Sequence, residues 1–187
     1  MNWLVFALMT VISWGVYGAF LHTGQTLMKP PGAVGVDPSV MRYKAFLFVG
    51  IAYFLVAVLA PLALLLSKGA AFSGYTSKGM GWSLVAGIVG AIGAFGVLLA
   101  FGAGGTPPVV MAIVFAGAPI VNALFSIWQH PPAGGISSIK PQFFLGIVLA
   151  ALGGCLVTYY KPNPPAPKTQ AASTQAATKA TLSPDAK

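Results

Sequence analysis

The side chains that could carry out chemistry are few in this sequence. Ser126 and His130 are four residues apart, a spacing that would place a hydroxyl and an imidazole on one helix face, but prolines follow directly. His22 has no second metal ligand at helical spacing, and Cys155 is the only cysteine, which excludes an intrachain disulfide and a cysteine-based zinc site. Because no set of nucleophile, base and orienting group can be assembled, we expect no enzymatic activity, no metal and no cofactor.

Polar side chains inside otherwise apolar runs indicate a different chemistry, the binding of a small polar solute. The first run carries a stripe of such residues with spacings of three and four. The stripe consists of Thr10, Ser13, Trp14, Tyr17 and Gly18. With Tyr53 and Asn122 from two other runs, it predicts a common cavity, because polar groups within a membrane tend to face the interior. In the alternative interpretation, the hydroxyls bond to carbonyls of their own helix and the aromatic rings only pack.

Pro119 and Asn122 interrupt the run "VVMAIVFAGAPIVNALFSIW" near its middle. A proline there removes an amide donor, frees the carbonyl of Phe115 and kinks the helix. Such a break survives in a membrane only where protein or water satisfies the freed group. Asn122 follows three residues later on nearly the same face. One interpretation is a kinked, polar wall of a substrate path, and the other is a proline kink with an interhelical amide bond of about 1 kcal/mol.

The composition is typical of an integral membrane protein. The chain has 187 residues, of which 57% are hydrophobic and only 6% are charged, against about a quarter in soluble domains. The formal net charge of +8 comes from basic residues scattered over the loops and the tail. Because no basic run alternates with aromatic residues, we expect the lipid bilayer as a partner and no nucleic acid.

Five charge-free stretches are long enough to cross a bilayer, and they predict an all-α bundle of five transmembrane helices. Each has 18 to 22 residues, which matches a hydrocarbon core of about 30 Å. The predicted helices are 3–21, 46–66, 80–101, 109–128 and 143–160, in a domain that covers residues 1–161. Residues 162–187 have almost nothing to bury and predict a disordered tail.

The connections predict further details. The short segment "GAGGTPP" predicts a tight antiparallel hairpin of the third and fourth helices, with Gly102 as a left-handed stop, Thr106 as N-cap and Pro107 in the first turn. The first connection is long, rich in Pro and Gly, and compatible with a longer first helix. Pro61 is interpreted as a terminator of the second helix.

Basic residues indicate the orientation in the cell (inner) membrane. Seven of them lie on the side of the first connection and the tail, and three lie on the opposite side. The seven are Lys29, Arg42, Lys44, Lys161, Lys168, Lys179 and Lys187, and the three are Lys68, Lys78 and Lys140. The positive-inside rule then places the N-terminus outside and the C-terminus in the cytoplasm.

Small residues indicate how the helices pack, because helix association in lipid relies on close approach. Gly90 and Gly93 mark a packing face on the third helix, and Gly146 and Gly154 mark another on the fifth. These faces exceed what one five-helix bundle needs. We therefore expect an oligomer.

Several of these motifs resemble the drug/metabolite transporter (EamA-like) superfamily. "ISWGVYGAF" resembles the Trp-Gly signature of its first helix, and "LLAFGAGGTPPVVMAIVFAGAPIVNALFSIW" with "FFLGIVLAALGGCLVTYY" resembles its helices three to five. Pro119 matches the proline of the fourth helix, and Gly146 and Gly153 match glycines of the fifth. The resemblance covers about residues 3–161 and implies a carrier of a small polar metabolite.

The sequence also departs from that family. Residues 129–131 read Gln-His-Pro where the family often has a Gly-Glu pair, and the first loop is longer. Members of the ten-helix branch carry two inverted five-helix repeats, whereas this chain holds one. The resemblance therefore implies a homo-oligomer or a half-repeat partner that completes the site. The alternative function is a non-transporting structural or accessory subunit of a membrane complex.

Overall fold

The computed structural model describes residues 2–161, and within this range the chain forms helices and no strand. Five helical segments are long and apolar enough to cross a membrane, which confirms the all-helical class. They are α1 (Trp3–Leu27), the run Pro38–Ser67 that starts with α2 (Pro38–Phe54), α4 (Ser77–Gly102), α5 (Pro107–Gln129) and α6 (Pro141–Tyr159). A short 3-10 turn, η2 (Ile136–Ser138), precedes α6. The predicted tail, residues 162–187, lies outside the described residues.

The first two helices are longer than predicted at the end where the first connection joins them. α1 continues past residue 21 to Leu27, and α2 begins at Pro38 rather than at residue 46. Asp37 caps α2, because its carboxylate accepts hydrogen bonds from the amide of Ser39 at 2.8 Å and from its hydroxyl at 2.6 Å. The predicted boundaries followed the apolar run, whereas the backbone hydrogen bonds extend beyond it.

The second span contains a π-helical turn, η1 (Leu55–Leu59), between α2 and α3 (Ala60–Ser67). Pro61 has no amide hydrogen for the carbonyl four residues earlier. Directly before it, the amide of Ala60 donates to the carbonyl of Leu55, five residues back. The interpretation of Pro61 as a terminator is therefore wrong, because the widened turn absorbs the missing donor and the helix continues to Ser67.

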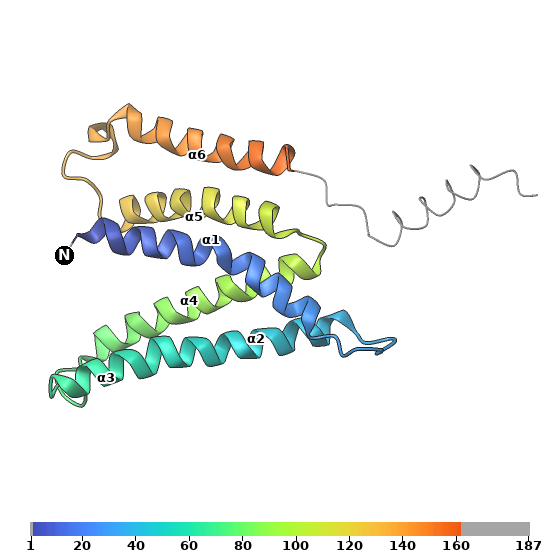
Figure 1. Ribbon diagram of the computed structural model, residues 1–187. Coiled ribbons are helices and arrows are strands. Elements are labelled where there is room, and N and C mark those ends of the chain that lie inside the picture. The colour runs from blue at the N-terminus through green and yellow to red at the C-terminus, as the bar shows by residue number, and fades with distance from the viewer. Residues whose placement is uncertain (1, 162–187) are drawn as a thin grey trace, which may run out of the picture.

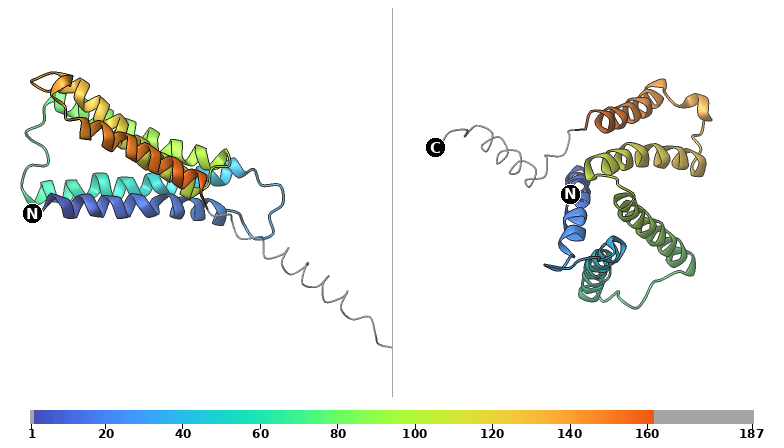
Figure 2. Two further views of the ribbon diagram at one scale, coloured as in Figure 1. Left: turned by 90° about the horizontal axis from the view of Figure 1, so that it is seen from above. Right: turned by 90° about the vertical axis from the view of Figure 1, so that its right-hand side faces the viewer.

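α1 and α4 each contact three other long helices, and neither has the more central position in the bundle. α1 contacts α2, α4 and α5, and α4 contacts α1, α2 and α5, whereas α6 contacts only α5 among the described elements. Seen along the helices, α6 lies on the far side of α5 from the other helices (Figure 2). The N-terminus and the end of α6 lie at opposite ends of the bundle, as five spans require (Figure 1).

The buried core is small and lies where α1, α4 and α5 meet. Leu98 is fully buried, and Leu21, Phe101 and Met111 surround it. Met111 reaches across to Gly18 of α1, where its Cγ lies 2.6 Å from the position that a Cβ would occupy. Most large apolar side chains on the long helices are exposed instead. Such faces are suited to contact with lipid.

The connection between α4 and α5 is short, as predicted, but its details differ. The left-handed residue is Gly104, with φ of +93°, whereas Gly102 is the last residue of α4. Thr106 is the N-cap of α5, although its side chain makes no capping hydrogen bond. The two helices meet next to the connection and then diverge (Figure 1). The hairpin is therefore tight only at its closed end.

The four predicted packing glycines differ in their surroundings. Gly154 lies against Ala116 of α5, and a Cβ at this position would overlap the Cβ of Ala116. Gly90, Gly93 and Gly146 have no such neighbour within 4 Å. Within the described chain only Gly154 of these four brings two helices together. The packing role of the other three stays a prediction that concerns a neighbouring molecule.

Candidate functional site

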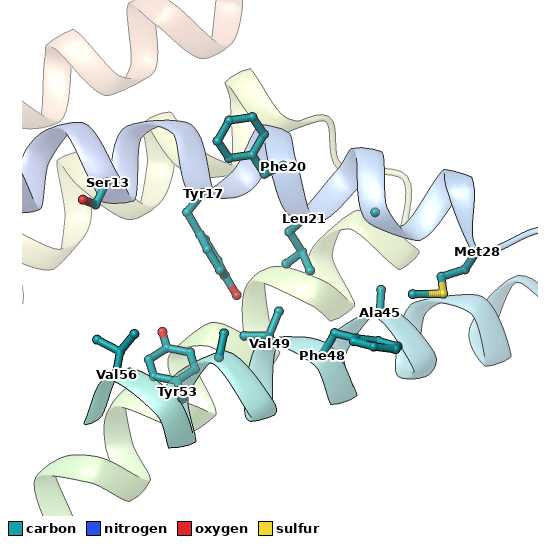
Figure 3. Close-up of a pocket in the computed structure, with 12 residues that line it drawn as sticks. Ser13, Tyr17, Phe20, Leu21, Met28, Ala45, Phe48, Val49, Tyr53 and Val56 are labelled. Atoms are coloured by element: carbon teal, nitrogen blue, oxygen red, sulfur yellow. The ribbon is translucent and has the colours of Figure 1, made fainter. Parts of the chain in front are cut away.

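A groove runs between α1 and the second span (Figure 3). Twelve residues line this α1–α2 groove, and its volume is about 630 Å³, within the range of small-molecule sites. Leu21 and Gly24 of α1 face Ala45 and Val49 of α2 in the part nearer the first connection. The lining is mostly apolar, so its few polar groups decide which solute could orient there.

Tyr17 and Tyr53 extend into the groove from opposite helices (Figure 3). Each lies near the middle of a helical segment that is long and apolar enough to cross a membrane. The Tyr17 hydroxyl is buried and has no hydrogen-bond partner among residues 2–161. Leaving a buried hydroxyl unpaired costs about 1–3 kcal/mol. A solute or water molecule that hydrogen bonds to Tyr17 would remove this cost.

The other residues of the α1 stripe divide between the groove and packing. Ser13 lines the groove, whereas the Thr10 hydroxyl donates to the carbonyl of Phe6 at 3.0 Å. Trp14 is half-buried against the core, and its ring centroid lies 5.4 Å from that of Tyr17. The structure therefore brings Ser13 and Tyr17 to the groove. Thr10 and Trp14 agree with the alternative interpretation, since Thr10 bonds to a carbonyl of its own helix and Trp14 packs against the core.

Pro119 and Asn122 do not line this groove. Both are exposed on α5, and the groove is built from α1 and α2. Asn122 lies three turns beyond the buried Met111, on nearly the same face of the helix. Met111 is covered where α1, α4 and α5 meet, whereas Asn122 is exposed beyond this junction, in the part of the bundle where α4 and α5 have diverged. The predicted cavity shared by Asn122, Tyr17 and Tyr53 is therefore not formed within the single chain.

A second groove, of about 640 Å³, lies between α5 and α6. Ala116, Gly154 and Cys155 are among its lining residues, and the Cys155 thiol is free and exposed. The hydroxyl of Thr158 donates to the carbonyl of Gly154 at 2.8 Å, so its hydrogen is not free to donate to a ligand. This groove offers apolar contact rather than recognition of a polar solute.

The sequence reasoning missed one feature of the α1–α2 groove. The π turn η1 begins two residues after Tyr53, and such turns often occur at functional sites. Val56, within this turn, lines the groove. Pro61 could have indicated this turn from the sequence, because it lies within an uninterrupted apolar run and has no amide hydrogen to donate to the helix.

No family model, no curated protein and no solved structure matches the chain. The resemblance to drug/metabolite transporters therefore rests on the sequence motifs, and the function has to be argued from the geometry.

Proposed function

We propose that the chain is a membrane transporter of a small polar metabolite, resembles one half of a drug/metabolite transporter, and works as an oligomer. The observation that supports this proposal is the pair Tyr17 and Tyr53 in a groove of about 630 Å³, at the middle of two membrane-length helices. Polar groups at that depth cost free energy unless they bind something.

The lining of the groove narrows the class of solute. Its hydroxyls belong to Ser13, Tyr17 and Tyr53, and none of its twelve residues is charged. A hydroxyl both donates and accepts hydrogen bonds, whereas apolar walls favour a carbon skeleton. The solute that fits best is therefore uncharged, with hydroxyl, amide or amine groups on an apolar body.

A second copy of the chain is the partner that we propose for the opening between α4 and α5. Gly90 lies two turns before the buried Val97 on nearly the same face of α4, and Asn122 lies three turns after the buried Met111 on nearly the same face of α5. Both residues therefore face the gap where the helices diverge. Glycine permits close approach of a further helix, and the Asn122 amide offers it a hydrogen bond. A half-repeat partner of opposite orientation would use the same surface.

We further propose that the chain lies in the cell (inner) membrane with the N-terminus outside and the C-terminus in the cytoplasm. The excess of basic residues on the side of the first connection supports this orientation. A reporter that is active only in the cytoplasm, fused after Lys187, should be active. Activity of a reporter that requires export would reverse the assignment.

The first experiment asks whether the groove contains water. In a Cys155→Ser background, a single cysteine is placed at Ala52, which lines the groove, or at Ile51, which does not. Both positions lie at nearly the same depth because they are adjacent in the helix. The side chain of Ile51 is 54% exposed, on a surface away from the groove lining. A small membrane-impermeant thiol reagent should label A52C and leave I51C unlabelled. Equal protection of both would indicate a lipid-filled groove and contradict the proposal.

The second experiment measures transport directly. The purified protein is reconstituted in proteoliposomes, and uptake or exchange is measured against sugars, amino acids and nucleosides. We expect saturable flux of at least one solute that competes with labelling of A52C. A wet groove without flux of any solute on the panel would favour the second candidate function.

That second candidate is a non-transporting accessory subunit. The observation that favours it is the position of α6, which contacts only α5 in the described chain, with Leu145, Leu149 and Leu152 more than half exposed. A subunit that attaches through α6 would protect this face in native membranes, whether or not the groove is wet. Labelling of L149C in native membranes and in the purified protein distinguishes the two functions. A different protein attached through α6 protects L149C in native membranes but not after purification, whereas a stable dimer of this chain gives the same labelling in both.

A further inference from the structure

Three helices meet at one end of the bundle, where α1 and α4 finish and α2 begins (Figure 1). Two of them contribute polar side chains whose buried nitrogens have no hydrogen-bond partner among the described residues. These nitrogens are His22 Nδ1 and Gln25 Nε2 of α1 and Arg42 Nε of α2. The three groups lie away from the tyrosines of the α1–α2 groove, so a ligand bound by them does not depend on transport.

Arg42 lies directly on the end of α4. Its Nε is 2.7 Å and its Cζ 2.8 Å from the position that a Cβ would occupy on Gly102. Only a glycine leaves room for the guanidinium there. The neighbouring carbonyls of Leu99, Ala100 and Phe101 already accept hydrogen bonds from the amides of the following loop. The attraction of the helix end for a cation explains the position of Arg42, but it leaves the donors of the guanidinium unused.

Gln25 and His22 face the same junction. The His22 ring meets the ring of Phe101 edge-on at 5.6 Å between centroids. Gln25 lies one turn beyond Leu21, a core residue that contacts the same part of α4, and only 7% of its surface is exposed. A buried amide of this kind is normally hydrogen-bonded. The unpartnered donors of Gln25 and Arg42 therefore lie near the end of α1 and the start of α2, at the same end of the bundle, and each requires an acceptor.

Among the described residues, the negative charge that acts on this junction is that of Asp37, which attracts Arg42 electrostatically. Its carboxylate is fully exposed and accepts hydrogen bonds from Ser39, and the buried Nε of Arg42 has no hydrogen-bond partner among these residues. Leaving the buried Nε of Arg42 without an acceptor is costly, because the donor belongs to a charged group. Lys29 and Lys44, on the same side of the membrane, add to the local positive potential.

We propose that the junction of Arg42, Gln25 and His22 binds a phosphate group. Arg presents its donors in a planar fork that matches phosphate oxygens, and the Gln25 amide supplies a further donor. The junction lies at the end of the apolar spans, where the phosphate of a phospholipid headgroup is found, and a free phosphate ion would use the same donors.

The test measures thermal stabilisation of the purified full-length protein in a mild, uncharged detergent. Dioleoylphosphatidylglycerol, dioleoylphosphatidylcholine and inorganic phosphate are titrated separately, with sodium chloride at matched ionic strength as the reference. We expect saturable stabilisation of the wild type by at least one phosphate-containing probe. Stabilisation by phosphatidylglycerol without inorganic phosphate identifies a lipid headgroup, whereas stabilisation by inorganic phosphate identifies a site open to free anions.

Matched variants decide whether the effect comes from this junction. Arg42→Gln should weaken the apparent affinity about tenfold or more, as expected for a lost charge-assisted hydrogen bond. Lys44→Gln removes the same charge two residues away, from an exposed position, and should leave the affinity nearly unchanged. Equal losses in the two variants would show diffuse attraction of anions and overturn the proposal, as would the absence of stabilisation by any probe.

A further variant covers the case in which Arg42→Gln does not fold. Gly102→Ala keeps every charge but places a methyl group where the guanidinium lies, so it should displace Arg42 and weaken the affinity. Gly104→Ala in the adjacent loop has open space around it but a positive φ, and it controls for general destabilisation of the connection. A loss of affinity with Gly104→Ala as large as with Gly102→Ala would contradict the proposed site.

Discussion

Gly154 of α6 and Ala116 of α5 are in contact at the closest approach of these two helices, and a Cβ on Gly154 would also lie 3.4 Å from the carbonyl oxygen of Ala112. α6 contacts α5 and no other described element. Its place in the bundle therefore depends on this contact and on the small residues around it.

The first prediction tests this contact. Gly154→Ala adds a methyl group against the backbone of α5 and should lower the free energy of unfolding in detergent by about 1–3 kcal/mol, as overpacking does. Gly146→Ala on the same helix meets nothing within 4 Å and should be neutral or slightly stabilising. Denaturation of both variants measures the difference. If Gly146→Ala destabilises as strongly, contacts outside the described chain, rather than the α5 contact, govern this face.

The second prediction concerns the groove. Tyr17→Phe and Tyr53→Phe each remove one hydroxyl without changing the shape of the ring, so transport should fall while folding is retained. A loss of about 1–3 kcal/mol in binding corresponds to roughly fivefold to more than a hundredfold in apparent affinity. Tyr43→Phe removes a hydroxyl from α2 outside the groove and should leave flux unchanged. Flux that is unaltered in both groove variants would remove the main support for the transport proposal.

The third prediction concerns the proline within α5. Pro119→Ala restores an amide donor for the carbonyl of Phe115 and should straighten the helix, while the protein still inserts. We expect solute flux to drop, because a kink at Pro119 would shape the gap between α4 and α5. Pro108→Ala is the matched control, since a proline in the first turn of a helix breaks no hydrogen bond. Equal flux in Pro119→Ala and wild type would make Pro119 a packing feature.

The fourth prediction concerns assembly. Cys155 is exposed on α6, so a membrane-permeant bifunctional thiol reagent should trap a dimer in native membranes, and Cys155→Ser should abolish the product. Asn122→Leu should reduce the dimer yield, because an amide bond between membrane helices contributes about 0.6–2 kcal/mol. Exclusively monomeric products, together with a monomeric mass in mild detergent, would exclude the proposed oligomer.

The fifth prediction concerns pH. The hydrogen bonds from the Ser39 hydroxyl and amide hold the pKa of Asp37 below its ordinary value. A depressed pKa means that the stabilisation is complete above the ordinary value of about 3.9 and is lost as the pH falls through the lower folded-state value. Wild-type stability should therefore decline below about pH 4. Asp37→Asn keeps an acceptor at the cap without a titrating group, so it should decline less. Parallel acid profiles of the two proteins would contradict this assignment.

The sequence by itself determined which segments form helices. An apolar run of about twenty residues satisfies its backbone hydrogen bonds internally, so its existence does not depend on its neighbours. The five predicted runs therefore correspond to the five candidate spans of the structure. The ends were less well predicted, because Arg42 and Lys44 are compatible with a helix that continues outside the hydrocarbon core.

The tertiary structure decided which face of each helix meets another. Tyr17 and Tyr53 were predicted to share a cavity and line one groove, whereas Asn122 was assigned to the same cavity and faces a different opening. The periodicity of α5 places Met111 and Asn122 on nearly the same face. Met111 is buried in the core with residues of α1 and α4, whereas Asn122 is exposed where α4 and α5 have diverged. Likewise, Gly146 and Gly154 are equivalent in a pattern of small residues. Gly154 contacts Ala116 of α5, whereas Gly146 has no such neighbour within 4 Å in the described chain. This difference depends on how far α5 and α6 are apart along their length, which the sequence of α6 alone does not determine.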